Sequence, residues 1–203
     1  FDYEPLDPET APRGVVGIPR VLGLYENYPF WFTLFTKLGY SVKLSPKSSR
    51  EIYDRGIETM PSESVCYPAK LSHGHIMSLL DEGVKFIFYP ALPYEMDNGG
   101  GGDNHYNCPV VAYYPEVLVG NCPELENTKF IYDYINLARR KDFTKRFPAI
   151  LDQYFPGIPV KEVHAAIDAA YDEYEHHMTQ VRAKGAEIIA RARAEHRHII
   201  VLA

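Results

Sequence analysis

The chain has 203 residues, of which 46% are hydrophobic and 24% charged, and its formal net charge is -6 at pH 7. This length is sufficient for a hydrophobic core and fits one large domain or two small ones. The negative charge argues against a nucleic-acid-binding protein, which usually carries a basic face. The sequence has no apolar run of about 18 residues that would predict a membrane span, and no signal peptide opens it. Its three widely spaced cysteines make a poor disulfide framework, so we expect a cytoplasmic protein.

The first two thirds of the sequence alternate apolar, β-forming segments with helical patterns. Strands are expected at residues 15–22, 40–45, 84–90 and 129–135. Helices are expected from Asn27 or Tyr28, just before Pro29, to Gly39, and at residues 48–59, 68–83 and 109–119. A strand, a helix and a second strand form a βαβ unit, and the segment 84–90 is apolar enough for a central parallel strand. We therefore predict an α/β fold, a parallel sheet with flanking helices.

After about residue 137 the pattern becomes helical. Helices are expected at 141–154 and 160–195, and the second would span roughly 50 Å, so we expect it to brace two domains. The last residues, 198–203, are apolar and predict a terminal strand, which suggests a fragment of a longer protein. We divide the chain into an α/β domain, residues 1–137, and a helical extension with one long helix, residues 138–203.

Each cysteine lies one or two residues before a proline. The pairs are Cys66 with Pro68, Cys108 with Pro109, and Cys122 with Pro123. A proline pushes the preceding residue out of the helical region and suits the first turn of a helix. We therefore expect the thiols just before helix starts, where free N–H groups and the helix dipole favour a thiolate, the form that binds metals and iron–sulfur clusters. A lone cysteine is otherwise a small core residue, and spacing favours that reading for Cys122.

In a doubly wound sheet, ligands bind beyond the carboxyl ends of the strands. This edge is expected to gather Cys66, Cys108 and His105 together with Glu26 and Glu95. His105 lies among loop-forming residues, so an ordered turn explains it as well as a ligand contact does.

The two histidines at 73 and 75 are best explained by packing, and several common catalytic or binding motifs are missing from the sequence. His73 and His75, two residues apart on a helix, must face different directions, and we expect one on the helix surface and one buried. The sequence has no Cys-x-x-Cys pair, no glycine-rich nucleotide fingerprint and no Gly-x-Ser-x-Gly. Zinc ribbons, nucleotide binding by those motifs and serine hydrolase chemistry are therefore disfavoured.

Several long motifs resemble one family. They lie at residues 17–20, 25–31, 61–70, 73–75, 86–90 and 103–109. The family is the domain of unknown function in large proteins described as CoA-substrate-specific enzyme activases, which is related to the 2-hydroxyacyl-CoA (2-hydroxyglutaryl-CoA) dehydratase subunits. The resemblance covers at least residues 13–137.

The resemblance implies a Rossmann-like sheet, and a parent protein from an anaerobic bacterium with an ATPase activase module in the same chain. The related dehydratase subunits hold a [4Fe-4S] cluster on three cysteines for one-electron reduction of a CoA thioester. It thus implies acyl-CoA or a redox partner protein as a partner. Cys66 and Cys108 match motif positions of the family, whereas Cys122 does not. The third expected cysteine, directly after the third strand, is replaced by Ala91.

Three hypotheses stay open. In the first, Cys66 and Cys108, with Cys122 as a weaker third ligand, belong to an iron–sulfur site of an ATP-driven redox system, and the chain alone is inactive. In the second, the chain is a non-catalytic α/β docking or scaffold domain. In the third, Cys66, Cys108 and His105 hold a structural zinc ion. The polar residues expected to line the site are Glu63, Ser64, His75, Asn104 and Tyr106.

Overall fold

The structure is a computed structural model that describes residues 3–99 and 101–201. Its sheet has four parallel strands in the order β2-β1-β3-β4. The strands are β1 (Val15–Ile18), β2 (Ser41–Leu44), β3 (Phe86–Phe88) and β4 (Lys129–Ile131). The connection from β1 leads outward to β2, and the chain then crosses to β3 on the other side of β1. The strand order therefore reverses between β1 and β3, as in doubly wound folds.

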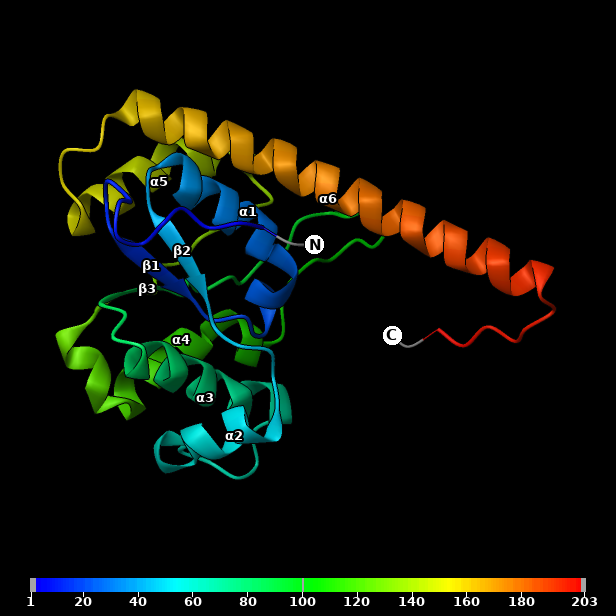
Figure 1. Cartoon of the computed structure of the whole chain (residues 1–203), viewed down its shortest axis with the longest axis horizontal. Coiled ribbons are helices and arrows are strands. Elements are labelled where there is room, and N and C mark those ends of the chain that lie inside the picture. The colour runs from blue at the N-terminus through cyan, green and yellow to red at the C-terminus, as the bar shows by residue number, and fades with distance from the viewer. Residues whose placement is uncertain (1–2, 100, 202–203) are drawn as a thin grey trace.

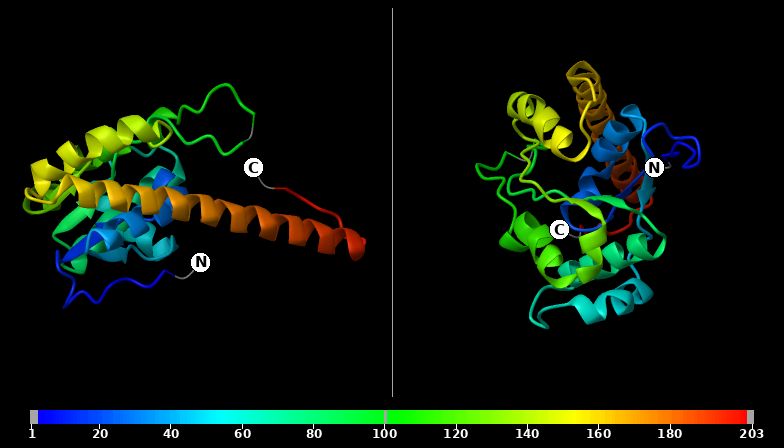
Figure 2. Two further views of the ribbon diagram at one scale, coloured as in Figure 1. Left: turned by 90° about the horizontal axis from the view of Figure 1, so that it is seen from above. Right: turned by 90° about the vertical axis from the view of Figure 1, so that its left-hand side faces the viewer.

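Helices cover both faces of the sheet (Figure 1). The helices are α1 (Gly23–Lys37), α2 (Arg50–Gly56), α3 (Tyr67–Asp81), α4 (Pro109–Asn121), α5 (Arg140–Tyr154) and α6 (Val160–Ala194), with short 3-10 turns η1 (Ile57–Thr59) and η2 (Pro123–Asn127). Two views at right angles place α1, α5 and α6 on one face and α2, α3 and α4 on the other (Figures 1 and 2). No described helix is both long and apolar enough to cross a membrane.

Aromatic side chains fill the space between the sheet and α1, α5 and α6. The ring of Trp31 lies 4.6 Å from that of Phe88 on β3, and the rings of Phe143 and Phe147 on α5 are 4.8 Å apart. All four side chains are buried in one continuous core cluster, which also contains Ile167 of α6. The helices after residue 137 thus share the core of the sheet region, and the division into two domains stays a prediction.

On the opposite face, two glycines bring α2 and α3 into backbone contact. A Cβ atom on Gly74 of α3 would lie 1.7 Å from the carbonyl oxygen of Ile52 in α2. A Cβ atom on Gly56 would lie 2.3 Å from the backbone nitrogen of Gly74. Only hydrogen fits at these two positions, so the glycines determine how closely the two helices pack.

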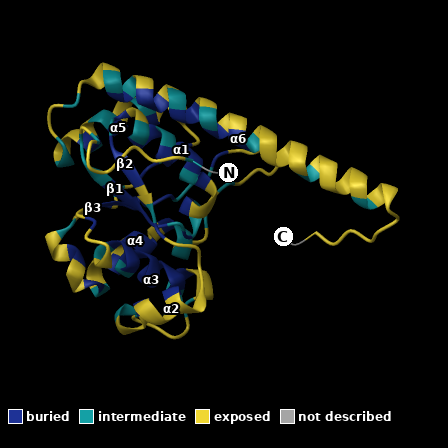
Figure 3. Cartoon of the chain, in the orientation of Figure 1, coloured by how far each residue is buried: buried dark blue, intermediate teal, exposed yellow. Residues whose placement is uncertain are grey.

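The long helix α6 has two different halves. Its buried residues run from Val163 to His177 and pack mainly on α1, whereas no residue from 179 to 194 is buried. This second half, called here the overhang (residues 179–194), contacts the body at its start, where Arg182 donates to the Asn98 carbonyl, and then projects beyond the body (Figures 2 and 3).

The predicted α/β class is confirmed, and the elements match apart from their ends. The first strand ends at Ile18 rather than at residue 22, because Pro19 follows it. The first helix begins at Gly23, so the prediction of a start at Asn27 or Tyr28 is wrong. Pro29 is instead tolerated inside α1, on a helix that also buries Leu24 and Trp31.

The predicted terminal strand is also wrong for residues 198–201. These residues are exposed and pair with no strand in the described part of the chain. A strand needs a neighbour for its N–H and C=O groups, and apolar composition alone does not supply one. The rest of the predicted strand, residues 202–203, lies outside the described residues.

Candidate functional site

Cys66 and Cys108 both lie at the carboxyl edge of the sheet, each as the residue that precedes a helix. Cys66 is the N-cap of α3 and Cys108 the N-cap of α4, and both have extended backbones with a proline in the first helical turn. Both side chains are exposed. The prediction that these two thiols sit at helix starts is confirmed, since the local geometry imposed by proline decides it.

The surroundings of the two thiols meet at one apolar cavity. The cavity has a volume of about 400 Å³ and is lined by residues of the loop 61–65 and by α4, including Val65, Pro109 and Tyr113. Cys66 directly follows Val65, and Cys108 directly precedes Pro109. The Cys108 sulfur also accepts a hydrogen bond of 3.5 Å from the backbone N–H of Val111. Each cysteine is therefore next in sequence to a residue that lines this cavity, although neither thiol is itself a lining residue.

Cys122 lies elsewhere. It is the C-cap of α4, at the opposite end of a 13-residue helix from Cys108, which is a separation of about 20 Å. Its side chain is 1% exposed, and burial raises the pKa of the thiol, so it is protonated at neutral pH. Although Cys122 also precedes the short 3-10 turn η2, burial of the thiol prevents the thiolate that we expected at this helix start.

Cys122 belongs instead to a buried polar cluster around His73. The Nδ1 atom of His73 lies 2.8 Å from Oγ1 of Thr59 and 3.8 Å from the Cys122 sulfur, and Nε2 lies 3.0 Å from the Tyr114 hydroxyl. The Thr59 hydroxyl donates to the Gly56 carbonyl, so Nδ1–H of His73 donates to Thr59 and the Tyr114 hydroxyl donates to Nε2. Burial lowers the pKa of His73 to about 4, and the ring is neutral.

His75 is fully buried as well, on the other side of α3. Its Nδ1 lies 2.8 Å from Oγ of Ser45 and its Nε2 lies 3.0 Å from Oγ of Ser48. Burial, with a smaller contribution from the positive charge of Arg20, lowers the pKa of His75 to about 4. The expectation that one of the two histidines lies on the helix surface is wrong, since both have 0% exposure. His75 joins the loop between β2 and α2 to α3, and with 0% exposure it offers no surface to the site.

The segment after β3 carries the position of the expected third cysteine. Ala91 there is buried, and its backbone pairs with Tyr134 in an extension of the sheet. Glu95 follows, and its carboxylate accepts hydrogen bonds from the Asn27 side chain (3.0 Å) and the Asn107 side chain (3.4 Å). This carboxylate joins α1 to the loop before Cys108.

The remaining predicted residues lie on the loops of this edge. His105 is half-buried, with its ring against Tyr94, and Glu63 and Ser64 are exposed. Asn104 accepts a hydrogen bond from the backbone N–H of Tyr106, an ordered turn of the kind expected there. Within residues 3–99 and 101–201, no three His, Cys, Asp or Glu side chains form a group that could hold a metal ion.

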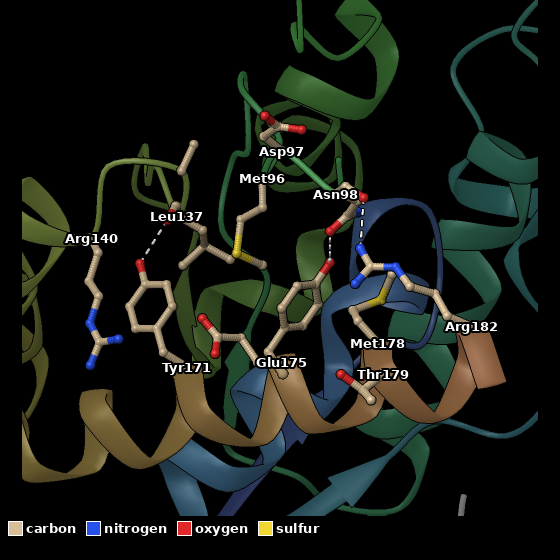
Figure 4. A pocket seen from close by; sticks show the side chains of 12 residues that line it. Met96, Asp97, Asn98, Leu137, Arg140, Tyr171, Glu175, Met178, Thr179 and Arg182 are labelled. Carbon is tan, nitrogen blue, oxygen red and sulfur yellow. Dashed lines mark hydrogen bonds between the residues drawn. The ribbon is translucent and has the colours of Figure 1, made fainter. Parts of the chain in front are cut away.

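Two further cavities, which the sequence did not reveal, lie between α6 and this edge. One, of about 530 Å³, separates α6 from the loops at 96–98 and 137–140 (Figure 4). Tyr174 and Arg182 of α6 both bind Asn98 across it, at 3.3 and 2.7 Å. The other, of about 510 Å³, is lined by Arg20 and Lys47 from the loops after β1 and β2. In the sequence, this second cavity is marked only by a basic residue shortly after each of the first two strands. Basic residues are too common after strands for this pattern to identify a binding site.

Comparison with known proteins identifies the family of this chain. The model of the family described as "CoA enzyme activase uncharacterised domain" matches residues 15–203. No curated protein and no solved structure matches the chain.

Proposed function

Since the chain belongs to the CoA enzyme activase uncharacterised domain family, we propose that it supplies two thiolate ligands, Cys66 and Cys108, to an iron–sulfur site for one-electron transfer in acyl-CoA chemistry. The observation that carries the proposal is the placement of these two thiols. They are exposed, precede two different helices, and are each next in sequence to a residue that lines one cavity at the carboxyl edge of a parallel sheet. The N-terminal N–H groups and dipole of a helix stabilise negative charge at such positions.

The residues of this chain do not by themselves fit a complete cluster. A [4Fe-4S] cluster takes three or four thiolates, and this edge offers two, because Cys122 is buried at the other end of α4 and Ala91 occupies the third position. We therefore assign the remaining ligands to another part of the parent protein or to a partner. In the same proposal the ATPase activase module and a redox partner or acyl-CoA lie outside these residues.

Anaerobic reconstitution of the full-length protein tests the proposal. We expect bound iron and labile sulfide in the wild type, loss of both in Cys66→Ala and in Cys108→Ala, and retention in Cys122→Ala, which is the matched control. The reconstituted 203-residue chain alone should hold little iron. Absence of iron from the full-length wild type, or full iron in the two edge variants, would overturn the proposal.

A second candidate function is a non-catalytic docking or scaffold domain. The observation that favours it is the overhang of α6, which has no buried residue in the described structure although it continues the helix by several turns. Full-length Cys66→Ala separates the two candidates. If redox activity is lost while folding and complexes stay intact, a purely scaffolding role is untenable.

The zinc alternative has less support. It needs Cys66, Cys108 and His105 together, and the described residues form no such group. Metal analysis of the protein as purified tests this alternative directly. It predicts one zinc ion per chain in the wild type and loss of the zinc in His105→Ala.

A further inference from the structure

The cavity of about 510 Å³ between α6 and the ends of β1 and β2 has no cysteine among its described lining residues. Its walls come from four parts of the fold. They are Arg20 after β1, Lys47 after β2, Tyr25 and Glu26 on the first turn of α1, and Tyr174 and Met178 on α6. A volume of this size is typical of pockets for small organic molecules. The position, outside the carboxyl ends of parallel strands, is where doubly wound folds bind ligands.

Two cations in this cavity lack an acidic partner. Arg20 and Lys47 form no ion pair in the described part of the chain, whereas Arg13, Lys43 and Arg140 all pair with carboxylates. The Arg20 guanidinium lies over aromatic rings instead, 6.0 Å from the centre of Tyr25 and 5.8 Å from that of Tyr28. Glu26 is the one acidic side chain among the lining residues that the structure describes. The cavity thus presents an excess of positive charge in a chain whose net charge is -6.

Hydrogen bonds around the buried His75 ring hold the backbone segments that carry Arg20 and Lys47. The Ser45 hydroxyl accepts the backbone N–H of Arg20 at 2.8 Å and contacts His75, and Ser48 contacts the other nitrogen of the same ring. Lys47 lies between these two serines in the chain. The backbones on which Arg20 and Lys47 are carried are therefore fastened to one imidazole that is fully buried. Fixed backbones reduce the entropy that a ligand must overcome on binding.

The turn from β1 into α1, next to this cavity, has an unusual backbone conformation. Leu22, two residues after Arg20, has φ 50° and ψ -136° although it is not a glycine. Such a conformation costs on the order of 1–3 kcal/mol and persists only where the surroundings enforce it. Strained backbone of this kind is frequent at binding sites, and here it sets the path of the chain between Arg20 and the exposed ring of Tyr25.

We propose that this cavity binds a small organic oxyanion, a phosphate or a carboxylate, with the anionic group at Arg20 and Lys47 and an apolar ring or chain against Tyr25 and Met178. The two cations supply charge-assisted hydrogen bonds to the oxygens. The apolar side chains of α1 and α6 enclose the rest of the molecule. The site uses none of the cysteines, so the failure of the thiol proposal leaves it standing.

Titration of the 203-residue chain with simple probes tests the site. Phenyl phosphate, benzoate, inorganic phosphate and the uncharged benzyl alcohol are added at millimolar concentrations and low salt, with calorimetry or amide chemical shifts as the readout. We expect saturable binding of at least one aromatic anion, and binding of benzyl alcohol at least about ten-fold weaker. Comparison of phenyl phosphate with benzoate decides between a phosphate and a carboxylate ligand.

Three variants and a control make the test specific. Arg20→Gln and Lys47→Ala should each weaken binding of the aromatic anion by about ten-fold. Tyr25→Ala should weaken phenyl phosphate or benzoate but leave inorganic phosphate unchanged. Lys37→Ala, an exposed cation at the last turn of α1 and the other edge of the sheet, should bind as the wild type does.

The proposal is overturned if neither aromatic anion saturates, if benzyl alcohol binds equally well, or if Lys47→Ala binds with wild-type affinity. Lys47 is exposed and its substitution leaves the core untouched, so this variant keeps the test decisive even if Arg20→Gln fails to fold. A loss in Lys37→Ala equal to that in Lys47→Ala would show a general charge effect and would also overturn it.

Discussion

The layer of α2, α3 and α4 and the carboxyl edge of the sheet treat their reactive side chains differently. Inside the layer, the His73 ring lies buried in contact with Cys122 and Tyr114. At the edge, Cys66 and Cys108 face solvent, and Arg20 and Lys47 have no acidic partner in the described structure. Both regions contain chemically versatile side chains. In the interior every one of these groups is held neutral, with the pKa of His73 lowered to about 4 and that of Tyr114 raised to about 12 by burial.

Environment, rather than residue type, therefore separates structural from functional groups in this fold. A buried neutral thiol beside a neutral imidazole is a poor nucleophile and a poor metal ligand, since both roles need the thiolate. The thiols at the two helix starts are instead exposed to solvent, where a reagent or a metal ion can reach them. Substitutions in the interior should therefore alter stability, and substitutions at the edge should alter binding and reactivity.

The largest effect is expected where α2 and α3 touch. Gly74→Ala would place a Cβ atom 1.7 Å from the Ile52 carbonyl oxygen, so the two helices must separate. We expect a loss of more than about 4 kcal/mol in the free energy of unfolding, measured by urea denaturation. Gly185→Ala in the overhang, where no atom lies within 4 Å, is the control and should gain up to about 1 kcal/mol. Similar losses in both variants would contradict this account of the packing.

The two buried histidines should make the protein acid-sensitive. Each has a pKa of about 4 in the folded state against an ordinary value near 6.5 when unfolded. The unfolded state therefore binds more protons, and stability falls as the pH drops from about 6.5 toward 4. At pH 5 each imidazole should lower the free energy of unfolding by about 2 kcal/mol relative to pH 7. Urea denaturation at both pH values measures this, and equal stabilities would show that the histidines are not buried neutral.

Exchange of sulfur for oxygen should distinguish the cysteines. Cys122→Ser places a hydroxyl in a buried position and should lower the free energy of unfolding by about 1–2 kcal/mol. Cys108→Ser should change it by less than about 0.5 kcal/mol, because the side chain is exposed and serine is itself a good N-cap. Thermal or urea denaturation of the two variants gives the comparison. A larger loss in Cys108→Ser than in Cys122→Ser would reverse it.

The smallest perturbation is labelling of the thiols in the native protein. A reagent such as Ellman's should react rapidly with Cys66 and Cys108 and reach Cys122 only after denaturant is added, because Cys122 is 1% exposed. Mass spectrometry of peptides identifies the labelled positions. Rapid native labelling of Cys122 would show that the α3–α4 contact opens readily.

The parts of the structure that were predicted correctly rest on local signals. The apolar segment around Ile87 identified the central strand, and the prolines after Cys66 and Cys108 identified two helix starts, because each signal acts over a few residues. The start of α1 was missed because burial of Leu24 and Trp31, a tertiary effect, outweighs the preference of Pro29 for a first turn.

The candidate site was predicted only in part for the same reason. Both histidines can be buried because their ring nitrogens find hydrogen-bond partners outside α3. The partners of His73 are Thr59 and Tyr114, and those of His75 are Ser45 and Ser48. None of them could be identified from the sequence around the histidines. The cavity at Arg20 and Lys47 needs α6 as its wall, and no pattern in the sequence says where a long helix packs. The missing strand at 198–201 likewise depends on a neighbour that apolar composition cannot reveal.

Because α6 is packed along one half and overhangs along the other, a small tilt of its packed half would move its far end over a larger distance. Tyr174 lies at the rim of the Arg20–Lys47 cavity, and Ala194 lies 20 residues, or about 30 Å, farther along the axis. A tilt of about 10° at the cavity would therefore carry the far end through about 5 Å. Spin labels on Arg193 and Lys43 would register such a displacement as a changed distance. If a molecule bound at the cavity tilted α6, the movement would in this way be larger at a surface well away from the cavity.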